Sequence, residues 1–319
     1  MDDMITFVQF IHPGEESRPT RQNRTDLIPW NYGRHKRKFL CHRGWYMDHG
    51  RQVQHDELTF WGEWEPQSRM TRLDNPREDK CLPHFLHRPV LNLNAPQRDA
   101  KERFRRDTDP FVFHERFLYR CCQQITIRGQ TRLAHLLPGS IVLFGSRVNG
   151  LFAVDTVFVV GDDFRDYYDQ KGSMDFDPNL AQYAEIVGVG LDSSGSGNHS
   201  GCGKHSGCGN HSGCGNNQLK MRLYYGASPD KPYKGMYSFV PCKRLRGNEQ
   251  GWARPTLTQD DMRDIYADCI TNNLQRSFKY CQNATLDSNI AAWNHIRTLF
   301  ARRGYLEGIR FECPQNGQI

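Results

Sequence analysis

The sequence lacks any long apolar run. No stretch approaches the roughly 18 consecutive apolar residues that a membrane-spanning helix needs. The first ten residues, MDDMITFVQF, lack the basic segment that opens a secretory signal, so we expect no signal and a cytoplasmic location. The chain also lacks a P-loop, a G-x-G-x-x-G after a strand, a G-x-S-x-G and an H-E-x-x-H. These absences argue against nucleotide-fuelled and zinc-protease chemistry.

Cysteine is present, but not in a pattern typical of disulfide frameworks or zinc ribbons. The chain has 11 cysteines, an odd number, and no C-x-x-C pair. Three of them lie in one short repeat, and the others are scattered. Because we expect no secretory signal, the sequence favours reduced thiols over disulfides.

The most regular part of the chain is Leu136–Asp163, which predicts a β-hairpin. Its two apolar runs, Ile141–Ser146 and Leu151–Val160, are rich in Val, Ile and Phe, as half-buried strands are. Asn149-Gly150 lies between them and is a strong tight-turn dipeptide. The sequence therefore predicts a β-rich core.

The rest of the chain predicts an α+β fold, with a mixed or antiparallel twisted sheet or a small barrel and C-terminal helices packed on it. Residues 1–257 form the β-rich part, and residues 258–319 belong to the same domain. Helical spacing predicts helices from Thr258 to Leu274 and over Leu286–Arg303. Further strands are expected at residues 5–11, 39–47, 52–64, 110–123, 186–191, 219–225, 235–241 and 305–312, and a short basic helix at 99–107.

A Gly/Ser-rich insert at residues 193–217 carries a hexapeptide repeat with alternating His and Cys. Imidazole and thiolate are ligands that zinc prefers. The insert contains no apolar residue that would bury it, so it also reads as a disordered linker. If the protein acts by binding metal through this repeat, deleting the insert should abolish its activity. Under the other hypotheses, the deletion should leave folding intact. The zinc ligands would be His199, Cys202, His205, Cys208, His211 and Cys214.

The net charge of +6 is concentrated in the N-terminal part. Residues 1–135 hold 23 Lys and Arg against 18 Asp and Glu. A basic half indicates an anionic partner, nucleic acid first, although such an excess is also found on ordinary solvated surfaces. Cations would hold phosphates and aromatic rings would stack on unpaired bases. The candidate residues for this interface are Arg34, His35, Lys36, Arg37, Lys38, Trp61, Trp64 and Arg254.

Four residues are candidates for acid–base chemistry: His12, Glu63, Glu65 and Asp155. His12 ends a predicted strand, and the two glutamates share a strand face, where paired carboxylates can act as acid and base. Asp155 interrupts an apolar strand and must be paired, hydrogen-bonded or facing an opening. The alternative for His12 is a polar turn residue, and for the two glutamates it is a solvated outer face. For Asp155 it is a structural hydrogen bond at a bulge.

The hairpin resembles the central hairpin of the PUA-like superfamily, which includes EVE and ASCH domains. Pro138-Gly139-Ser140 stands where that superfamily often has a Gly-Asp step, and Gly150-Leu151-Phe152 stands at its gly-x-phe element. Ser140 replaces the usual acidic residue, and the ASCH signature Gly-x-Lys-x-x-Glu-x-Arg is absent. The resemblance spans residues 110–190. It implies a small twisted β-barrel with a cleft for RNA or a modified base, in a bacterial or phage context of nucleic-acid modification or defence.

Three functions follow from these patterns. The first is nucleic-acid binding, including the reading or processing of a modified base. The second is an enzyme on nucleotides or nucleic acid, a nuclease or base-modifying transferase, which requires the four acid–base candidates to converge in one cleft. The third is metal binding through the His/Cys repeat.

Overall fold

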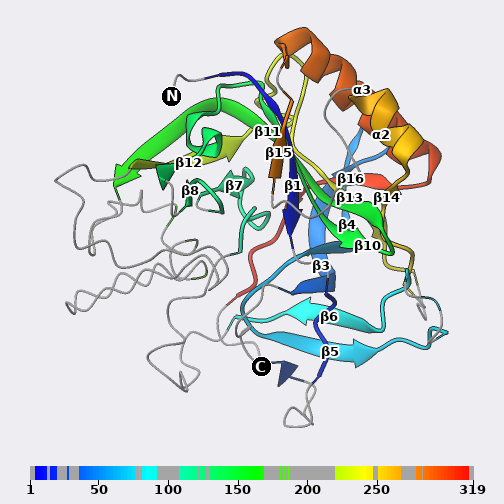
Figure 1. Ribbon diagram of the computed structural model, residues 1–319. Helices are drawn as coiled ribbons and strands as arrows, with labels where there is room; N and C mark the ends of the chain where they lie inside the picture. The colour runs from blue at the N-terminus through cyan, green and yellow to red at the C-terminus, as the bar shows by residue number, and fades with distance from the viewer. Residues whose placement is uncertain are drawn as a thin grey trace, which may run out of the picture.

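In a computed structural model of the chain, the described residues form mainly two mixed β-sheets, with α-helices on one side (Figure 1). The structure describes residues 4–12, 15–19, 27–28, 36–76, 79, 81–91, 108–120, 122–126, 129–168, 180, 183, 186, 220–246, 251–266, 278–281 and 283–315. Within these residues no helix has the length and apolar character needed to cross a membrane.

The first sheet contains the predicted hairpin at its centre. Its strands are β15 (Phe278–Tyr280), β1 (Phe7–His12), β10 (Ile141–Val148), β11 (Leu151–Tyr168), β12 (Lys220–Gly226) and β7 (Leu118–Tyr119), in that order, with β14 (Thr256–Leu257) paired to β11. β1 runs parallel to β10, and the other pairs are antiparallel.

The turn of the hairpin confirms its sequence signal. Asn149 and Gly150 have φ angles of 50° and 80°. Positive φ at both central residues is the conformation of a type I′ turn, whose twist matches that of the strands it joins. Arg147, Asn149 and Gly150 at this turn are exposed to solvent.

The second sheet is ordered β16 (Leu306–Phe311), β13 (Val240–Arg244), β4 (Val53–Glu63), β3 (Arg37–Met47), β6 (Phe85–Pro89), β5 (Ser68–Arg72) and β2 (Leu27–Ile28). β16 also pairs with β3, so β3, β4, β13 and β16 pair in a closed ring. The N-terminal end of β3, at Phe39 and Leu40, pairs with β6 and so connects the ring to the β5–β6 hairpin. Beside the two sheets lie a short hairpin, β8 (Ile125–Thr126) and β9 (Gly129–Gln130), and a 3-10 turn, η2 (Arg132–His135).

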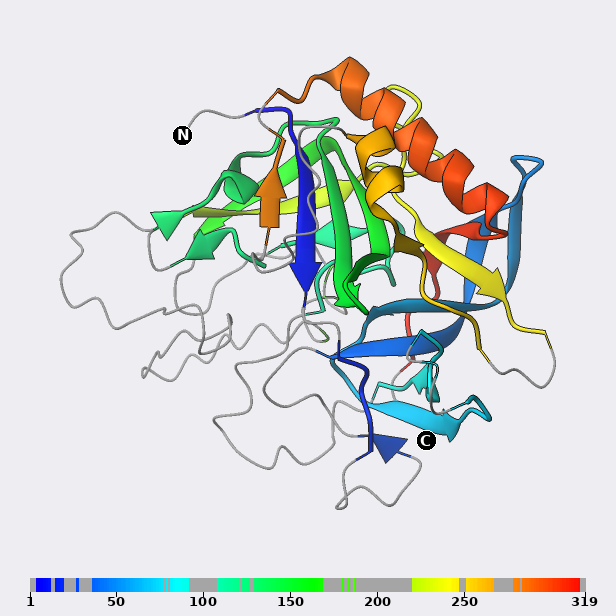
Figure 2. The same cartoon turned by 45° about the vertical axis from the view of Figure 1, so that its right-hand side comes forward.

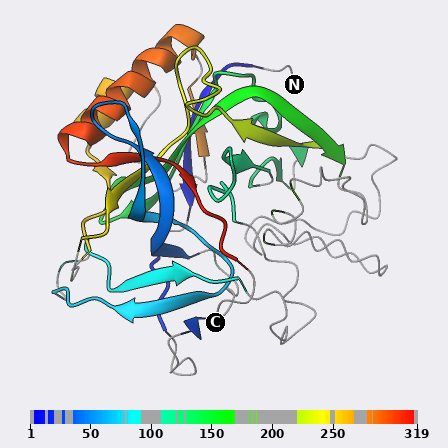
Figure 3. The same ribbon diagram turned by 180° about the vertical axis from the view of Figure 1, so that it is seen from behind.

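The first sheet lies between the helices and the second sheet. α2 (Gln259–Ile265) and α3 (Leu286–Arg302) begin at capping boxes formed by Thr258 and Thr285, as the sequence predicts for Thr258. Trp293 and Ile296 of α3 belong to one buried cluster with residues of β1, β10 and β11, whereas the opposite face of these strands packs against β3 and β4. Figures 2 and 3 show α3 across one side of the molecule and β5–β6 at the other end.

Several predicted elements differ from the structure. Ile186 is helical, so the expected strand at 186–191 is wrong at this position, and β12 pairs with β11 and β7 instead. The described residues within 110–123 form the short β7, a bridge between Phe111 and Leu118, and turns, so the long strand expected there is wrong. Cys281 is disulfide-bonded, which corrects the expectation of reduced thiols there. The insert at 193–217 and the helix at 99–107 lie outside the described residues.

Candidate functional site

Asp155 sits at a β-bulge in β11. Phe144 pairs with Thr156 and Gly145 pairs with Val154, so Asp155 is the extra residue between them. A bulge places two consecutive side chains on one face of a sheet. Here it directs Asp155 and Thr156 together toward the second sheet, where both line the same small cavity. The structure thus confirms the bulge alternative for Asp155.

Arg37 joins Asp155 to Glu63 in a buried ion triad between the two sheets. Its Nε lies 2.6 Å from Asp155 Oδ2 and its Nη1 lies 2.9 Å from Glu63 Oε2, and all three side chains are buried. Burial alone would lower the pKa of Arg37, but attraction to Glu63 and Asp155 raises it above its usual value. Burial raises the pKa of Asp155, and the charges of Arg37 and Arg254 oppose that rise.

Lys38 is buried on the opposite face of β3. Its Nζ donates hydrogen bonds to the carbonyl oxygens of Trp64, at 2.5 Å, and Pro66, at 3.1 Å. Burial lowers the pKa of Lys38 to about 8, while the charges of Glu65 and Glu63 act in the opposite direction. Arg37 and Lys38 therefore interact with internal groups from both faces of one strand.

These contacts correct the acid–base hypothesis. Glu63 and Asp155 do converge, but around Arg37, and the cavity beside them measures about 10 Å³, room for a single water at most. Glu63 and Glu65 are 5% and 2% exposed, so the expected outer face is buried. His12 is buried as well and its ring contacts Phe10 and Phe144. The cavity that Glu63 and Asp155 line is too small for a substrate.

The predicted nucleic-acid residues divide into two groups. Trp61 and Trp64 are buried and, like Arg37 and Lys38, contact the protein interior, so they cannot stack on bases or hold phosphates from this position. Arg37 and Lys38 fall on β3, which is covered on both faces at this end, and this is why their charges point inward. Lys36 is half-buried, and Arg34 and His35 lie outside the described residues. Arg254 is buried as well, but it lines a second and much larger cavity, which the other described candidates do not line.

Arg254 stacks on Trp61. The centre of its guanidinium lies 3.7 Å from the ring centroid, a close cation–π contact, and its side chain is 7% exposed. Burial lowers the pKa of Arg254 to about 10, with Asp155 acting against this shift, so the group stays positively charged at neutral pH. A buried, oriented cation thus faces the cavity.

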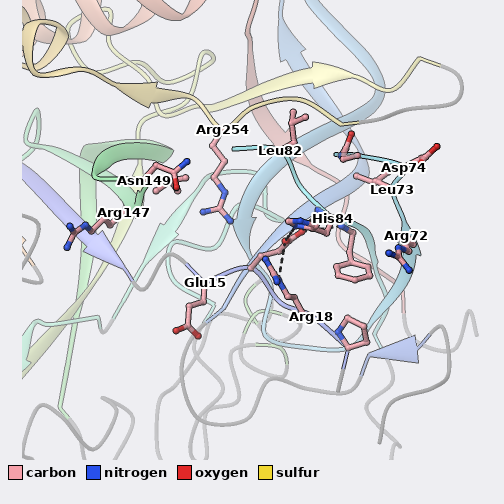
Figure 4. A pocket seen from close by; sticks show the side chains of 15 residues that line it. Glu15, Arg18, Arg72, Leu73, Asp74, Leu82, His84, Arg147, Asn149 and Arg254 are labelled. Atoms are coloured by element: carbon pink, nitrogen blue, oxygen red, sulfur yellow. Dashed lines mark hydrogen bonds and ion pairs between the residues drawn. The ribbon is translucent and has the colours of Figure 1, made fainter. Parts of the chain in front are cut away.

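This cavity, which we call the arginine cavity, has a volume of about 840 Å³. Five segments surround it: residues 15–19, 72–75 and 82–85, the hairpin tip at 147–149, and Arg254. Figure 4 shows Arg254 reaching toward its centre, with Arg147 and Asn149 on one side and Arg18, Arg72 and His84 on the other. Its lining residues are Glu15, Glu16, Arg18, Pro19, Arg72, Leu73, Asp74, Asn75, Leu82, His84, Phe85, Arg147, Val148, Asn149 and Arg254.

Four arginines and three carboxylates line this cavity, and Glu16 is held by its neighbours. Glu16 accepts hydrogen bonds from the backbone N–H groups of His84, at 2.7 Å, and Phe85, at 3.1 Å, and contacts the His84 ring at 2.8 Å. Arg18 approaches it at 3.7 Å with an exposed side chain. Arg72 and Arg147 are exposed and form no ion pair with any described residue. Four arginines against three carboxylates leave the lining with an excess of one positive charge.

Sequence reasoning missed Arg18, Arg72 and Arg147. Each is a single arginine in a polar segment, and they meet only because the hairpin tip of the first sheet lies beside the β5–β6 end of the second. The one available signal for Arg147 was its place next to the Asn149-Gly150 turn, since loop tips on a rigid hairpin often carry function.

Metal binding through the His/Cys repeat concerns residues outside those described. Among the residues that are described, no group of three His, Cys, Asp or Glu side chains is arranged to hold a metal ion. Comparison of the chain with protein-family models, with curated proteins and with solved structures finds no match, so the site is interpreted from its own geometry.

Proposed function

We propose that this chain is a nucleic-acid-binding protein that takes a single-stranded or displaced nucleotide into the arginine cavity. The observation that carries the proposal is the convergence of Arg18, Arg72, Arg147 and Arg254 on one cavity of about 840 Å³. Ligand cavities commonly measure about 300–1,000 Å³, so a nucleotide unit fits. Arginine is the side chain best suited to phosphate, because its planar fork donates two parallel hydrogen bonds.

The walls between the arginines support a nucleotide rather than a bare anion. Leu82, Phe85 and Val148 add apolar surface beside the cations. Single-strand binding proteins combine such surfaces, because the backbone follows the positive charge while the bases contact rings and apolar side chains. Phe85 is half-buried and offers a ring at this wall.

The enzymatic alternative has less support. Its carboxylates Glu63 and Asp155 are held by Arg37 beside a cavity that admits no substrate. The relation to PUA-like barrels stays a proposal, because β3, β4, β13 and β16, which pair in a closed ring, are not the strands of the resemblance. Reading of a modified base in a bacterial or phage setting belongs to the same proposal.

Fluorescence anisotropy with labelled single-stranded DNA and RNA over a salt series tests this function. We expect salt-sensitive binding, with Arg147→Ala and Arg72→Ala each reducing the slope of log Kd against log salt by about 0.7, the loss of one phosphate contact on a single strand. Arg263→Ala is the matched control, since Arg263 is a 63% exposed arginine on α2 and does not line the cavity. Equal affinity of all three variants and the wild type would refute the assignment.

A further inference from the structure

We propose that a strand bound in the arginine cavity continues along one face of the β5–β6 hairpin, where Arg69 and Arg88 contact its phosphates. The inference rests on the proposed function and extends the same site along the second sheet. Arg69 of β5 lies directly opposite Arg88 of β6, and both side chains are exposed. We call these two residues the arginine pair.

The arginine pair is unfavourable for the sheet itself. Like charges directly opposite each other on neighbouring strands destabilise a sheet. Arg88 forms an ion pair with Glu57 of β4, but Arg69 forms none with any described residue. On its other side Arg69 pairs with Leu27 of β2, which is apolar and cannot neutralise it. Proteins accept such unfavourable arrangements mainly at functional sites, so the pair points to an anionic partner.

Protection of a sheet edge does not explain Arg69. Charged side chains often keep the free edge of a sheet from pairing with another chain. At Arg69, however, β5 is paired on both sides, with β2 at Leu27 and with β6 at Arg88. The charge of Arg69 therefore has no edge to protect at this position.

The strand face that carries Arg69 leads into the arginine cavity. Side chains two residues apart share a face, so Arg69, the exposed Thr71 and Leu73 lie in one row, and Leu73 lines the cavity. The N–H of Leu73 donates a 2.9 Å hydrogen bond to the carbonyl oxygen of His84, another residue of the cavity wall. At about 3.3 Å per residue, Arg69 lies about 13 Å along the chain from Leu73. An extended strand that fills the cavity can therefore reach the arginine pair with its neighbouring phosphates.

A phosphate offsets the repulsion within the arginine pair. Arg88 directs its Nη1 to Glu57, which occupies only part of its guanidinium fork, and Arg69 has no ion-pair partner among the described residues. Arginine binds phosphate through two parallel hydrogen bonds. An arrangement that is unfavourable in the free protein thus becomes favourable once the strand is bound.

Fluorescence anisotropy over a salt series tests this path with a labelled pyrimidine strand of about 16 nucleotides, the upper end of the site size of one single-strand-binding fold. Arg69→Ala should lower the slope of log Kd against log salt by about 0.7, the loss of one phosphate contact. Arg69→Lys keeps the charge and should preserve the slope. Combining Arg69→Ala with Arg147→Ala should lower the slope by about 1.4, because both arginines contact one strand. Titration at protein concentrations well above Kd should give one strand per protein.

Arg302→Ala is the matched control. Arg302 is an exposed arginine of α3 that, like Arg69, forms no ion pair with a described residue, and it does not line the cavity. Its replacement should leave the salt slope unchanged. Urea unfolding examines the free protein: the midpoint for Arg69→Ala should equal or exceed that of the wild type, because the substitution removes a repulsion. A lower midpoint would show that Arg69 stabilises the free sheet and would overturn the inference.

The outcomes separate this inference from the proposed function. Salt-sensitive binding whose slope Arg69→Ala changes no more than Arg302→Ala does overturns the path and leaves the assignment of the arginine cavity intact. Two strands per protein would assign the arginine pair to a separate site and also overturn the path. No binding of the strand at low salt overturns the proposed function itself, and this inference with it.

Discussion

Replacing Asp155 by alanine should destabilise the protein strongly, because Arg37 would lose one of its two carboxylate partners in a closed interior. Asp155 Oδ2 lies 2.6 Å from Arg37 Nε, and both side chains are at most 4% exposed. Removing one partner of a buried ion pair typically costs about 3–5 kcal/mol, because the remaining charge stays buried without compensation. Glu63 still contacts Arg37 at 2.9 Å, so we expect the lower end, about 3 kcal/mol.

Urea unfolding measures this loss. With an m-value of about 3 kcal/mol/M, the midpoint should fall by about 1 M while m stays constant. Asp260→Ala is the matched control: its carboxylate pairs with Arg263 on the surface and its side chain is 80% exposed, so the change should stay within about 0.5 kcal/mol. A loss below about 1 kcal/mol for Asp155→Ala would refute the view that the triad holds the two sheets together.

Two further substitutions test the interior. Burial, reinforced by the charge of Lys38, lowers the pKa of His87 to about 3, so between pH 6.5 and 3 the unfolded chain binds a proton that the fold does not. Stability should therefore fall by about 1.4 kcal/mol per pH unit on acidification in this window, and His87→Asn should remove that part of the slope in urea unfolding at pH 7, 6 and 5; an unchanged slope contradicts the prediction. Gly145→Ala places a Cβ 2.3 Å from the Ala153 carbonyl oxygen and should cost about 2–3 kcal/mol by the same measurement, against about 1 kcal/mol for Gly150→Ala, whose Cβ meets no atom within 4 Å. Equal losses in the free energy of unfolding for the two variants would show that the backbone around the bulge shifts to accommodate the added Cβ, and would contradict this prediction.

The sequence was sufficient for elements whose signals are local. The Asn149-Gly150 turn needs positive φ at two successive positions, and few dipeptides supply it. The helix beginning after Thr258 shows a cap, acidic residues in its first turn and apolar periodicity within a few residues. Each of these signals lies within a few consecutive residues, so predicting the turn and the helix requires no knowledge of distant contacts.

The ion triad and the arginine cavity depend on contacts between distant segments. Arg37 and Asp155 are 118 residues apart, and their pairing requires both a bulge in β11 and the packing of two sheets. The basic run that includes Arg37 and Lys38 has the composition of a phosphate-binding surface. Composition does not show that both faces of β3 are covered, and this coverage turns both side chains inward.

The buried triad also determines the charge of the cavity wall. Arg37 lies within 3 Å of both Glu63 and Asp155, so Asp155, whose charge also acts on Arg254, is shared between two guanidinium groups. Attraction to Asp155 opposes the fall in the pKa of Arg254, which at about 10 still leaves the group positive at neutral pH. Charge in a poorly hydrated site acts more strongly than charge on an exposed rim, so Arg254, which is buried on Trp61, contributes more to the potential inside the arginine cavity than the exposed arginines do.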